Sequence, residues 1–462
     1  MLTQTSCEAF FSSLKGRRVA VCGLGRTHIP VVRQFLEHGA EVLACDKRDR
    51  AALGKTAGEL EKAGAVLRLG EGYLDDLQVD LILRSPGMNP TLPPLENARA
   101  RGVRVTTEIE LVLELSPAPV YGVTGSDGKT TTTSIIAGLL QAAGHTVHLG
   151  GNIGWPLLPG IEQIRPGDVV VVELSSFMLM HMERSPQVSV VTNIAPNHLD
   201  WHADMTEYRE AKRNIVRYQQ PGDRAVLNAG NAATAGFADG LKSRVFLFSR
   251  LGEVERGTYL GEDGVLYGRD GSERVPILPA KEIRLPGNHM IEDFLAAFAA
   301  VWGVVPPAVM GAFARGFGGV PHRCELVREL DGVKWYNDSI GTSPTRTIAG
   351  LRAFGHGVIL IAGGYDKHIP YDPLGPVAAE TVSAAILMGD TAPAIQSAIR
   401  ACSDLPIYRV KNMEEAVLTA RRLAEPGEIV FLSPASASFD LYRDFEERGD
   451  HFKRLVMDLM EG

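Results

Sequence analysis

The stretch GVTGSDGKTTTTSIIAGLL, residues 122–140, combines the end of an apolar strand, a glycine-rich turn, a Lys-Thr pair and the start of a helix. Backbone N–H groups of such a turn, backed by a helix N-terminus, bind anions. The spacing departs from the strict phosphate loop, because Val123 stands where the first glycine of that motif is expected. The order of strand, turn and helix still predicts a nucleotide phosphate site, with Lys129 at the outer phosphates and Thr130 at Mg²⁺.

The residues assigned to the phosphate site follow the turn into the helix. They are Gly125, Ser126, Asp127, Gly128, Lys129, Thr130 and Thr131. A later apolar run, DVVVVELSS, ends in Glu173. A carboxylate at a strand end beside a phosphate site can ligate a metal ion, although a solvent-facing glutamate fits the same pattern. The sequence therefore predicts a phosphate and metal site at one edge of a sheet.

Short apolar runs alternate with amphipathic stretches along the whole chain. Nine runs have the composition of buried parallel strands: RRVAVCGLG, EVLACD, DLILRSPG, PVYGVTGSDG, DVVVVELSS, VSVVTNIAP, GVILIAGG, AAILMG and EIVFLSPAS. Helical stretches between them make a repeating βα pattern, so the predicted fold class is α/β with mostly parallel sheets. Ligands bind such sheets beyond the carboxyl ends of the strands, where these motifs lie.

A chain of 462 residues is too long for a single core, so several domains are expected. The predicted domains are residues 1–108, which are Rossmann-like; residues 109–319, which resemble a P-loop ATPase with a mostly parallel sheet; and residues 320–462, a second Rossmann-like α/β unit. A polar, glycine-rich stretch at residues 250–272 predicts hairpins inside the central domain.

The composition of the chain limits the kinds of binding partner and the cellular compartment that we expect. The net charge of -8 provides no basic excess for a nucleic-acid backbone, so nucleic acid is not an expected partner. The five cysteines are scattered without CxxC spacing, which favours a reducing compartment. Neither a secretory signal nor a membrane-spanning run is recognised, so we expect a cytoplasmic protein without a membrane partner.

The first segment contains GLGRTH, in which His28 stands where a dinucleotide-binding motif has its third glycine. Asp46 ends the next apolar run, at the distance where that motif has an acid for a ribose. A two-glycine version of the motif is a weak indication of a nicotinamide cofactor. An oxidoreductase is further disfavoured because no acid or base suited to hydride transfer stands out.

Eight motifs occur in a specific order: VTGSDGKTTTT, GGNIG, ELSSF, TNIAPNHLDWH, EYREAKRNI, PHRCE, NDSIGTSPT and LSPASASFDLYRDFEERGDHF. Together they resemble the Mur ligase family, and within it the members that add D-glutamate to UDP-N-acetylmuramoyl-L-alanine. The resemblance implies an ATP-dependent amide ligase of peptidoglycan precursor synthesis. It implies that the substrate carboxylate attacks the γ-phosphate to give an acyl phosphate, which the amine of D-glutamate then attacks. ATP and two Mg²⁺ ions are the implied cofactors, and a monomer is expected.

The resemblance also implies roles for individual residues. The catalytic residues would be Lys129, Glu173, His198, Lys212 and Arg323. The metal ligands would be Thr130, Glu173, His198 and Lys212, the last with an N6-carboxylated side chain. The helix EYREAKRNI brings Tyr208 and Lys212 onto one face. From the sequence alone, such a lysine is usually solvated. His198 could be an ordinary loop histidine, but its place in NHLD, after a buried strand, favours a role in the site.

Nucleotide and substrate contacts follow from the same resemblance. The nucleotide would also contact Asp293, Arg323 and Asp338. The UDP-linked substrate is expected at Thr27, Asp46, Ser85, Gly87 and Asn152. D-Glutamate is expected at Thr342, Lys367, Ser438 and Phe445. Without the resemblance, Ser85 and Gly87 fit a plain turn equally well, and Lys367 fits a surface turn.

Four positions depart from the family pattern. Asp127 replaces an asparagine beside the phosphates, Met290 and Asp293 replace two asparagines at the adenine, and Ile340 replaces a lysine after NDS. Two other functions stay open. The chain could be another Mur-type or folylpolyglutamate-type ligase, or a non-catalytic sensor of a nucleotide sugar with the same fold.

Overall fold

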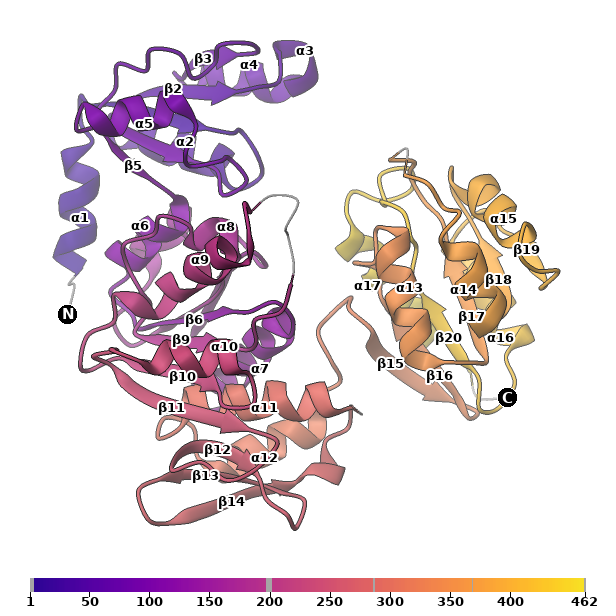
Figure 1. Cartoon of the computed structure of the whole chain (residues 1–462). Helices are drawn as coiled ribbons and strands as arrows, with labels where there is room; N and C mark the ends of the chain where they lie inside the picture. Colours follow the sequence, from indigo (N-terminus) through magenta and orange to yellow (C-terminus); the bar gives the residue numbers. More distant parts are fainter. Residues whose placement is uncertain (1–3, 197–201, 286, 368, 461–462) are drawn as a thin grey trace. The chain divides into compact units, whose positions relative to one another are not determined.

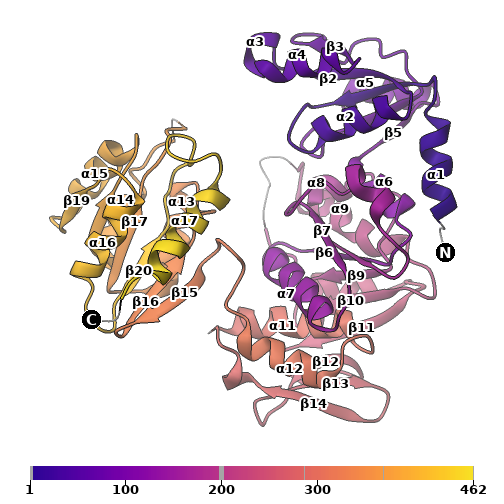
Figure 2. The same ribbon diagram turned by 180° about the vertical axis from the view of Figure 1, so that it is seen from behind.

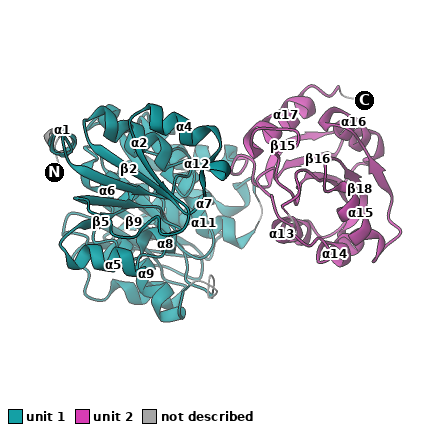
Figure 3. Cartoon of the chain, turned by 90° about the horizontal axis from the view of Figure 1, so that it is seen from above, with its two compact units in different colours: residues 1–317 teal, residues 318–462 magenta. Residues whose placement is uncertain are grey.

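The computed structural model describes residues 4–196, 202–285, 287–367 and 369–460. Contacts divide the chain into two compact units, residues 1–317 and residues 318–462 (Figure 3). Unit 1 contains two separate sheets and unit 2 contains one. No helix within the described ranges is long and apolar enough to cross a membrane.

The first sheet is built from five parallel strands in the order β3-β2-β1-β4-β5 (Figure 1). The elements of this region are α1 (Gln4–Ser13), β1 (Arg18–Cys22), α2 (His28–Glu37), β2 (Glu41–Asp46), α3 (Arg50–Leu53), α4 (Lys55–Lys62), β3 (Val66–Leu69), β4 (Leu81–Arg84), α5 (Pro93–Ala100), β5 (Arg104–Thr106) and α6 (Glu108–Leu115). The strand order reverses between β1 and β4. The turns that follow these two strands therefore open at the position where doubly wound sheets bind ligands.

The second sheet has nine strands in the order β14-β13-β12-β11-β10-β9-β6-β8-β7 (Figure 2). Its strands are β6 (Val120–Thr124), β7 (Val147–Gly151), β8 (Val169–Glu173), β9 (Val188–Val191), β10 (Arg224–Asn228), β11 (Arg244–Ser249), β12 (Arg256–Leu260), β13 (Val265–Asp270) and β14 (Arg274–Pro279). Strands from β7 to β12 across the sheet are parallel, and β13 and β14 add an antiparallel meander. The four valines of β8 are all buried, as expected for a central strand covered on both faces.

Helices of the second sheet position the site. They are α7 (Lys129–Ala142), η1 (Leu158–Gln163), α8 (Ser176–Leu179), α9 (Met205–Arg217), α10 (Ala232–Ala235), η2 (Gly236–Ala238), η3 (Ala280–Glu282), α11 (Asn288–Val301) and α12 (Pro307–Gly316). Helix α7 begins at Gly128 without a capping side chain, so its first N–H groups keep their capacity to bind an anion. Helix α9 begins at Asp204, whose carboxylate accepts the N–H of Glu207 at 2.8 Å.

Unit 2 contains a six-stranded sheet in the order β15-β16-β20-β17-β18-β19, in which only β15 is antiparallel to its neighbour among the described strands. Its elements are β15 (Glu325–Leu330), β16 (Val333–Asn337), α13 (Pro344–Phe354), β17 (Val358–Ala362), α14 (Leu374–Thr381), β18 (Val382–Leu387), α15 (Ala392–Arg400), β19 (Ile407–Arg409), α16 (Met413–Leu423), β20 (Ile429–Leu432) and α17 (Phe445–Met457). Apolar side chains cover both faces of this sheet.

The predicted α/β class is confirmed, and each of the nine quoted runs contains a strand. The predicted hairpins near residues 250–272 correspond to β12, β13 and β14. Strands β3, β5, β7, β10, β11, β15, β16 and β19 lie outside the quoted runs. Of these, β3, β5, β7 and β19 are partly exposed edge strands, which have no continuous apolar run. The domain boundaries at 108/109 and 319/320 stay predictions.

Candidate active site

The phosphate loop joins β6 to α7, and its two glycines lie against other elements. Gly125 has φ of +152°, and a Cβ there would come within 1.8 Å of the Thr192 hydroxyl. Gly128 has φ of +75°, and a Cβ there would come within 2.3 Å of the Asp293 carboxylate. Neither position therefore accepts a side chain, which keeps the backbone of the loop accessible to a closely approaching ligand.

Several hydrogen bonds within the protein hold the loop in shape. The Lys129 ammonium donates to the carbonyl oxygens of Gly125 at 3.0 Å and Ser126 at 2.8 Å. The Ser126 hydroxyl lies 3.0 Å from the Tyr208 hydroxyl and exchanges hydrogen bonds with the backbone of Ala195. The Ser126 N–H also donates to the Asn193 carbonyl at 2.9 Å, so both the hydroxyl and the backbone of Ser126 are occupied by protein contacts. Lys129 can exchange its carbonyl partners for phosphate oxygens by rotating its flexible side chain.

Glu173, at the end of β8, has one carboxylate oxygen occupied and one without a partner. Its Oε1 accepts a hydrogen bond from Asn152 Nδ2 at 2.7 Å. Its Oε2 is buried and has no hydrogen-bond partner among the described atoms. A buried, unsatisfied carboxylate oxygen is costly unless it binds something, and a hard cation is a suitable occupant. The unpartnered oxygen of Glu173 therefore fits the metal role predicted for it, while Asn152, predicted as a substrate contact, orients the carboxylate.

Lys212 lies on α9 with a fully buried side chain, only 2 % exposed. Its ammonium donates to the Gly125 carbonyl at 2.8 Å and to the Thr124 hydroxyl at 3.2 Å, and it lies 4.9 Å from the centre of the Tyr208 ring. Burial, reinforced by the charge of Lys129, lowers the pKa of Lys212 well below its usual value, despite the opposing charge of Glu173. The structure thus contradicts the ordinary expectation of a solvated lysine.

The residues present fit Mg²⁺ with a mixed donor set. No group of three histidine, cysteine or acidic side chains gathers in the part of the chain that the structure describes. Donors near the loop would therefore include the unpartnered oxygen of Glu173 and the hydroxyl of the buried Thr130. Thr131, which follows Thr130 on α7 and was also predicted at the phosphate site, is partly exposed. His198, the remaining predicted ligand, lies outside the described residues.

Asp293 is buried on α11 against the start of α7. Its Oδ1 accepts a hydrogen bond from the Thr132 hydroxyl at 3.1 Å. The carboxylate lies directly behind Gly128, whereas Asp127 is exposed. Asp293 therefore has a structural contact beside the loop, and its contact with the adenine stays a prediction.

The predicted UDP site gathers around the turns that follow β1, β2 and β4. Asp46 Oδ2 accepts the N–H of Leu24 at 2.7 Å and a guanidinium N–H of Arg48 at 2.8 Å. Burial opposes ionisation of Asp46, but these hydrogen bonds and the charge of Arg48 outweigh it and lower its pKa to about 2. The Ser85 hydroxyl lies 2.8 Å from the position of a Cβ on Gly23, which brings two turns together.

Three other residues complete this region. Thr27 is the N-cap residue of α2 and uses no side-chain hydrogen bond there, and Gly87 is exposed. His28 is fully buried, and burial lowers its pKa to about 4, so its neutral ring belongs to the core. Sequence reasoning missed Arg48. The signal available was its position, two residues after the acid that ends β2.

In unit 2, the turn PHRCE lies beneath the end of β16. The buried Asp338 accepts hydrogen bonds from the Ser433 hydroxyl at 2.8 Å and the Cys324 N–H at 3.2 Å. Burial raises the pKa of Asp338 to about 6, although these bonds and the charges of Arg323 and Arg346 oppose the shift. Arg323 itself is exposed. His322, with φ of +62°, instead faces inward against Phe445.

The residues predicted for D-glutamate come from separate loops of unit 2. The Lys367 ammonium lies 3.5 Å from the Thr342 hydroxyl, and Lys367 is exposed. Ser438 is buried, and its backbone carbonyl accepts the N–H groups of Leu441 and Tyr442 in a turn. The backbone carbonyl of Phe445 accepts the hydroxyl of Ser339 at 2.8 Å.

Arg448 organises these loops and was missed by sequence reasoning. Its guanidinium donates to Ser339, to the Ser436 carbonyl at 3.2 Å and to the Ala437 carbonyl at 3.0 Å. Burial lowers its pKa to about 10. The side chain thus links the segments after β16 and β20 to α17. Its position three residues after Phe445, on a helix, was the available signal.

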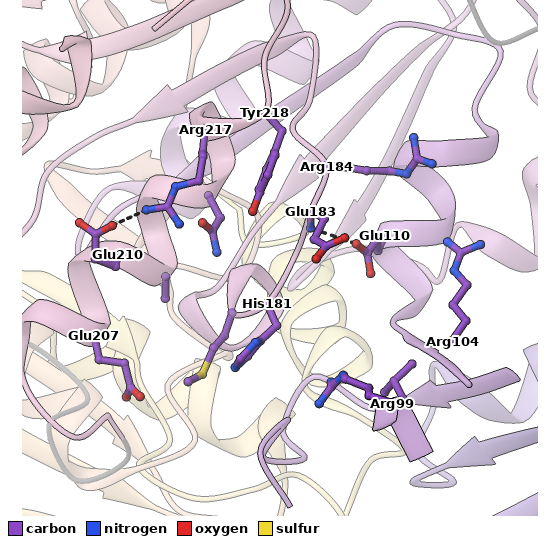
Figure 4. Close-up of a pocket in the computed structure, with 14 residues that line it drawn as sticks. Arg99, Arg104, Glu110, His181, Glu183, Arg184, Glu207, Glu210, Arg217 and Tyr218 are labelled. Atoms are coloured by element: carbon purple, nitrogen blue, oxygen red, sulfur yellow. Dashed lines mark hydrogen bonds and ion pairs between the residues drawn. The ribbon is translucent and has the colours of Figure 1, made fainter. Parts of the chain in front are cut away.

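A separate groove of about 920 Å³ lies along α9 in unit 1 (Figure 4). Arg217 and Glu210 form an ion pair on one wall, and Arg104 and Arg184 line the other. His181 also borders the groove. Both charge signs line this surface, and none of the predicted site residues does.

Family models match most of the chain. The model of the Mur ligase MurD-like N-terminal domain matches residues 17–107, that of the Mur ligase middle domain matches residues 123–301, and that of the Mur ligase glutamate ligase domain matches residues 322–436. These matches coincide with the three sheets, one model to each sheet.

Curated relatives extend the match over nearly the whole length. A UDP-N-acetylmuramoylalanine--D-glutamate ligase of Acetivibrio thermocellus is 49% identical, covering 98% of both chains. A ligase of the same name from Symbiobacterium thermophilum is 50% identical, covering 95% of this chain and 97% of its own.

A solved structure shares the fold. The UDP-N-acetylmuramate-alanine ligase of Thermotoga maritima has a TM-score of 0.54 and 18% identity, covering 96% of this chain and 99% of its own. The glycine-rich loop, the buried lysine and carboxylate beside it, and these matches lead to one conclusion. The chain belongs to the Mur ligase family.

Proposed function

We propose that the protein is an ATP-dependent ligase that adds D-glutamate to UDP-N-acetylmuramoyl-L-alanine in peptidoglycan precursor synthesis. The observation that carries this proposal is 49% identity over 98% of the chain to a relative bearing that name. The buried Glu173 and Lys212, with the partly buried Lys129 beside them, support a catalytic role over that of a nucleotide-sugar sensor. In this proposal residues 1–108 bind the UDP part, residues 109–319 bind ATP, and residues 320–462 bind the amino acid.

The chemistry requires an activated carboxylate. An oxygen of the L-alanyl carboxylate bonds to the γ-phosphorus of ATP, the bond to the bridging oxygen breaks, and ADP leaves. The amino group of D-glutamate, after losing a proton, bonds to the acyl carbon. The acyl C–O bond then breaks, phosphate leaves, and the nitrogen loses another proton to give the amide.

The first step brings two anions together, so their repulsion must be offset by positive charge. Lys129 would hold the outer phosphates, and the first N–H groups of α7 would hold the remaining oxygens. Mg²⁺, when bound, would neutralise phosphate charge and polarise the γ-phosphate. Asn152 holds Glu173 in the orientation that leaves Oε2 unpartnered, and its position suits a contact with the substrate as well.

The buried Lys212 supports an N6-carboxylated side chain. A lysine amine attacks CO₂ only in its neutral form, and burial favours that form. The amine nitrogen bonds to the CO₂ carbon and releases a proton, which replaces a cation by a carboxylate. That carboxylate would join Glu173, Thr130 and His198 around Mg²⁺, in keeping with the family.

Unit 2 supplies the proposed contacts for the nucleotide and D-glutamate. Asp338 would accept from the nucleotide, and the guanidinium of Arg323 would bind the γ-phosphate. Lys367 would pair with the side-chain carboxylate of D-glutamate beside Thr342, Ser438 and Phe445. The exposure of Lys367 and Arg323 leaves both cations accessible to ligands.

A coupled phosphate-release assay tests the proposed function. Purified protein with Mg²⁺ and ATP is expected to release phosphate only when UDP-N-acetylmuramoyl-L-alanine and D-glutamate are both present. A panel of other amino acids, including L-glutamate and diamino acids, provides the control. Release with a different amino acid would identify a sibling ligase, and no release with any acceptor would support a nucleotide-sugar sensor.

A further inference from the structure

Two substrate-facing loops of unit 1 meet through Arg26 and Trp155, which no role above explains. Arg26 lies in the glycine turn between β1 and α2, and Trp155 follows β7 and the GGNIG loop. Arg26 Nη2 donates to the Gly154 carbonyl at 3.3 Å, and its guanidinium carbon lies 5.8 Å from the centre of the Trp155 ring. Residues 129 positions apart thus bridge the expected UDP turn and the loop that holds Asn152.

The loop geometry fixes where Trp155 stands. Gly151 has φ of +89°, and a Cβ there would come within 2.3 Å of the Glu173 carbonyl. Gly154 has φ of +74°, and a Cβ there would come within 2.6 Å of the Leu149 carbonyl. These close approaches tie the loop to β7 and β8, so Trp155 projects from a constrained backbone.

Both side chains retain binding capacity. Trp155 is 75% exposed, unusual for the largest apolar side chain. The described contacts of Arg26 are a carbonyl oxygen and an aromatic face, neither of which neutralises its charge. Arg and Trp are the side chains that contribute most to binding when a partner covers them. Exposed together, they form a surface suited to a ligand with an anionic group next to an apolar face.

A UDP-linked amino sugar carries that combination, with a diphosphate joined directly to a pyranose ring. We propose that Arg26 and Trp155 clamp the UDP-linked substrate, Arg26 at a diphosphate oxygen and Trp155 over the carbon face of the sugar. The cation–aromatic contact orients the guanidinium before the substrate arrives. This inference rests on the proposed function, and it adds two positioning residues to it.

Binding of a series of truncated ligands separates the two roles. Uridine, UMP, UDP and UDP-N-acetylmuramoyl-L-alanine are titrated by calorimetry without ATP. Arg26→Ala is expected to weaken UDP and the full substrate about tenfold or more, and to leave uridine unchanged. Trp155→Ala is expected to weaken the full substrate about tenfold and UDP by a smaller factor, because the Gly154 carbonyl still holds the Arg26 guanidinium. Arg33→Ala, an exposed arginine of α2 paired with Glu59 at 2.9 Å, serves as the matched control.

Steady-state kinetics provide a second test, because loss of a substrate contact should change KM and not kcat. In both variants the KM for the UDP-linked substrate should rise while kcat and the KM for D-glutamate stay close to wild type. Wild-type affinity for the full substrate in either variant would overturn the proposal. An equal loss for uridine, UDP and the full substrate would also overturn it, because it would indicate a general defect of the turn. If wild-type protein binds the UDP ligands in the expected pattern but ligates no amino acid, the clamp stands and the proposed activity fails.

Discussion

At the scale of single residues, burial decides the chemistry of the site. Lys212 is a surface-type residue by its sequence context, yet its ammonium is enclosed by Thr124, Gly125 and Tyr208. Glu173 keeps one oxygen without a hydrogen bond in a buried position. Such groups are costly to a fold, and they persist where a ligand or a reaction uses them.

Lys212→Ala should lower kcat by at least about a hundredfold, because a proposed metal ligand is removed. Formate or acetate should restore part of the activity by supplying a carboxylate to the vacated space. Arg209→Ala, an exposed position on the same helix, is the matched control and should keep wild-type activity. The measurement is phosphate release with and without added acid. Full activity of Lys212→Ala would reject the carboxylated lysine.

Asp338 should make ATP binding sensitive to pH near 6. Burial raises its pKa to about 6, so the carboxyl gains a proton as the pH falls through that value and loses acceptor capacity. The KM for ATP should therefore rise several-fold from pH 8 to pH 5.5. In Asp338→Asn the KM should be high and nearly independent of pH over this range. A wild-type KM that stays constant from pH 8 to pH 5.5 would contradict the proposed nucleotide contact.

At the scale of elements, close approach between helices shapes the phosphate loop. The N-terminus of α7 lies against α11, and Gly128 has no space for a Cβ beside Asp293. Arg448 acts similarly in unit 2, where it holds the segments after β16 and β20 against α17. In unit 1 the packing of α11 fixes the start of α7, and in unit 2 Arg448 of α17 fixes the two segments that it contacts.

Gly128→Ala should destabilise the protein by about 2 kcal/mol and raise the KM for ATP at least about tenfold. The added methyl would strain the positive φ and force Asp293 away from the loop. Gly144→Ala is the matched control, because Gly144 also has a positive φ, of +91°, but has no atom within 4 Å of a Cβ. It should show only the smaller backbone penalty and an unchanged KM. Urea unfolding and initial rates measure both effects, and equal behaviour of the two variants would contradict the steric argument.

At the scale of the whole molecule, the chain folds as two compact units that meet at residues 317 and 318. Phe317 packs against Phe294 and Phe313 at the end of unit 1. The glycines that follow it open unit 2. Boundaries between domains generally fall in linker segments of this kind.

Limited proteolysis should cut first between Phe317 and Pro321. The expected products are two resistant fragments that correspond to residues 1–317 and 318–462, identified by mass spectrometry. Two proteases of broad but different specificity should give the same pair, since the backbone and not one side chain determines the site. A first cut inside either sheet would show that the compact units are not the units of stability.

Prediction from sequence succeeded where the signal is local. The buried strands were recognisable because β-branched runs such as the valines before Glu173 are continuous in the chain. The glycine-rich turn between β6 and α7 was recognisable because its glycines and Lys129 lie within a few residues of each other. The contacts of Arg48 and Arg448 could not be recognised from the sequence, because each depends on segments that only folding brings together.

The sequence by itself determined the alternation of strands and helices, the glycine turns and the order of motifs that identifies the family. These depend on backbone preferences and short spacings, which are encoded locally. The tertiary structure alone decided that Lys212 is buried, that Glu173 keeps an unpartnered oxygen, and that Arg26 meets Trp155. Burial and charge environment are sums over atoms distant in the chain, so no single stretch of sequence contains them.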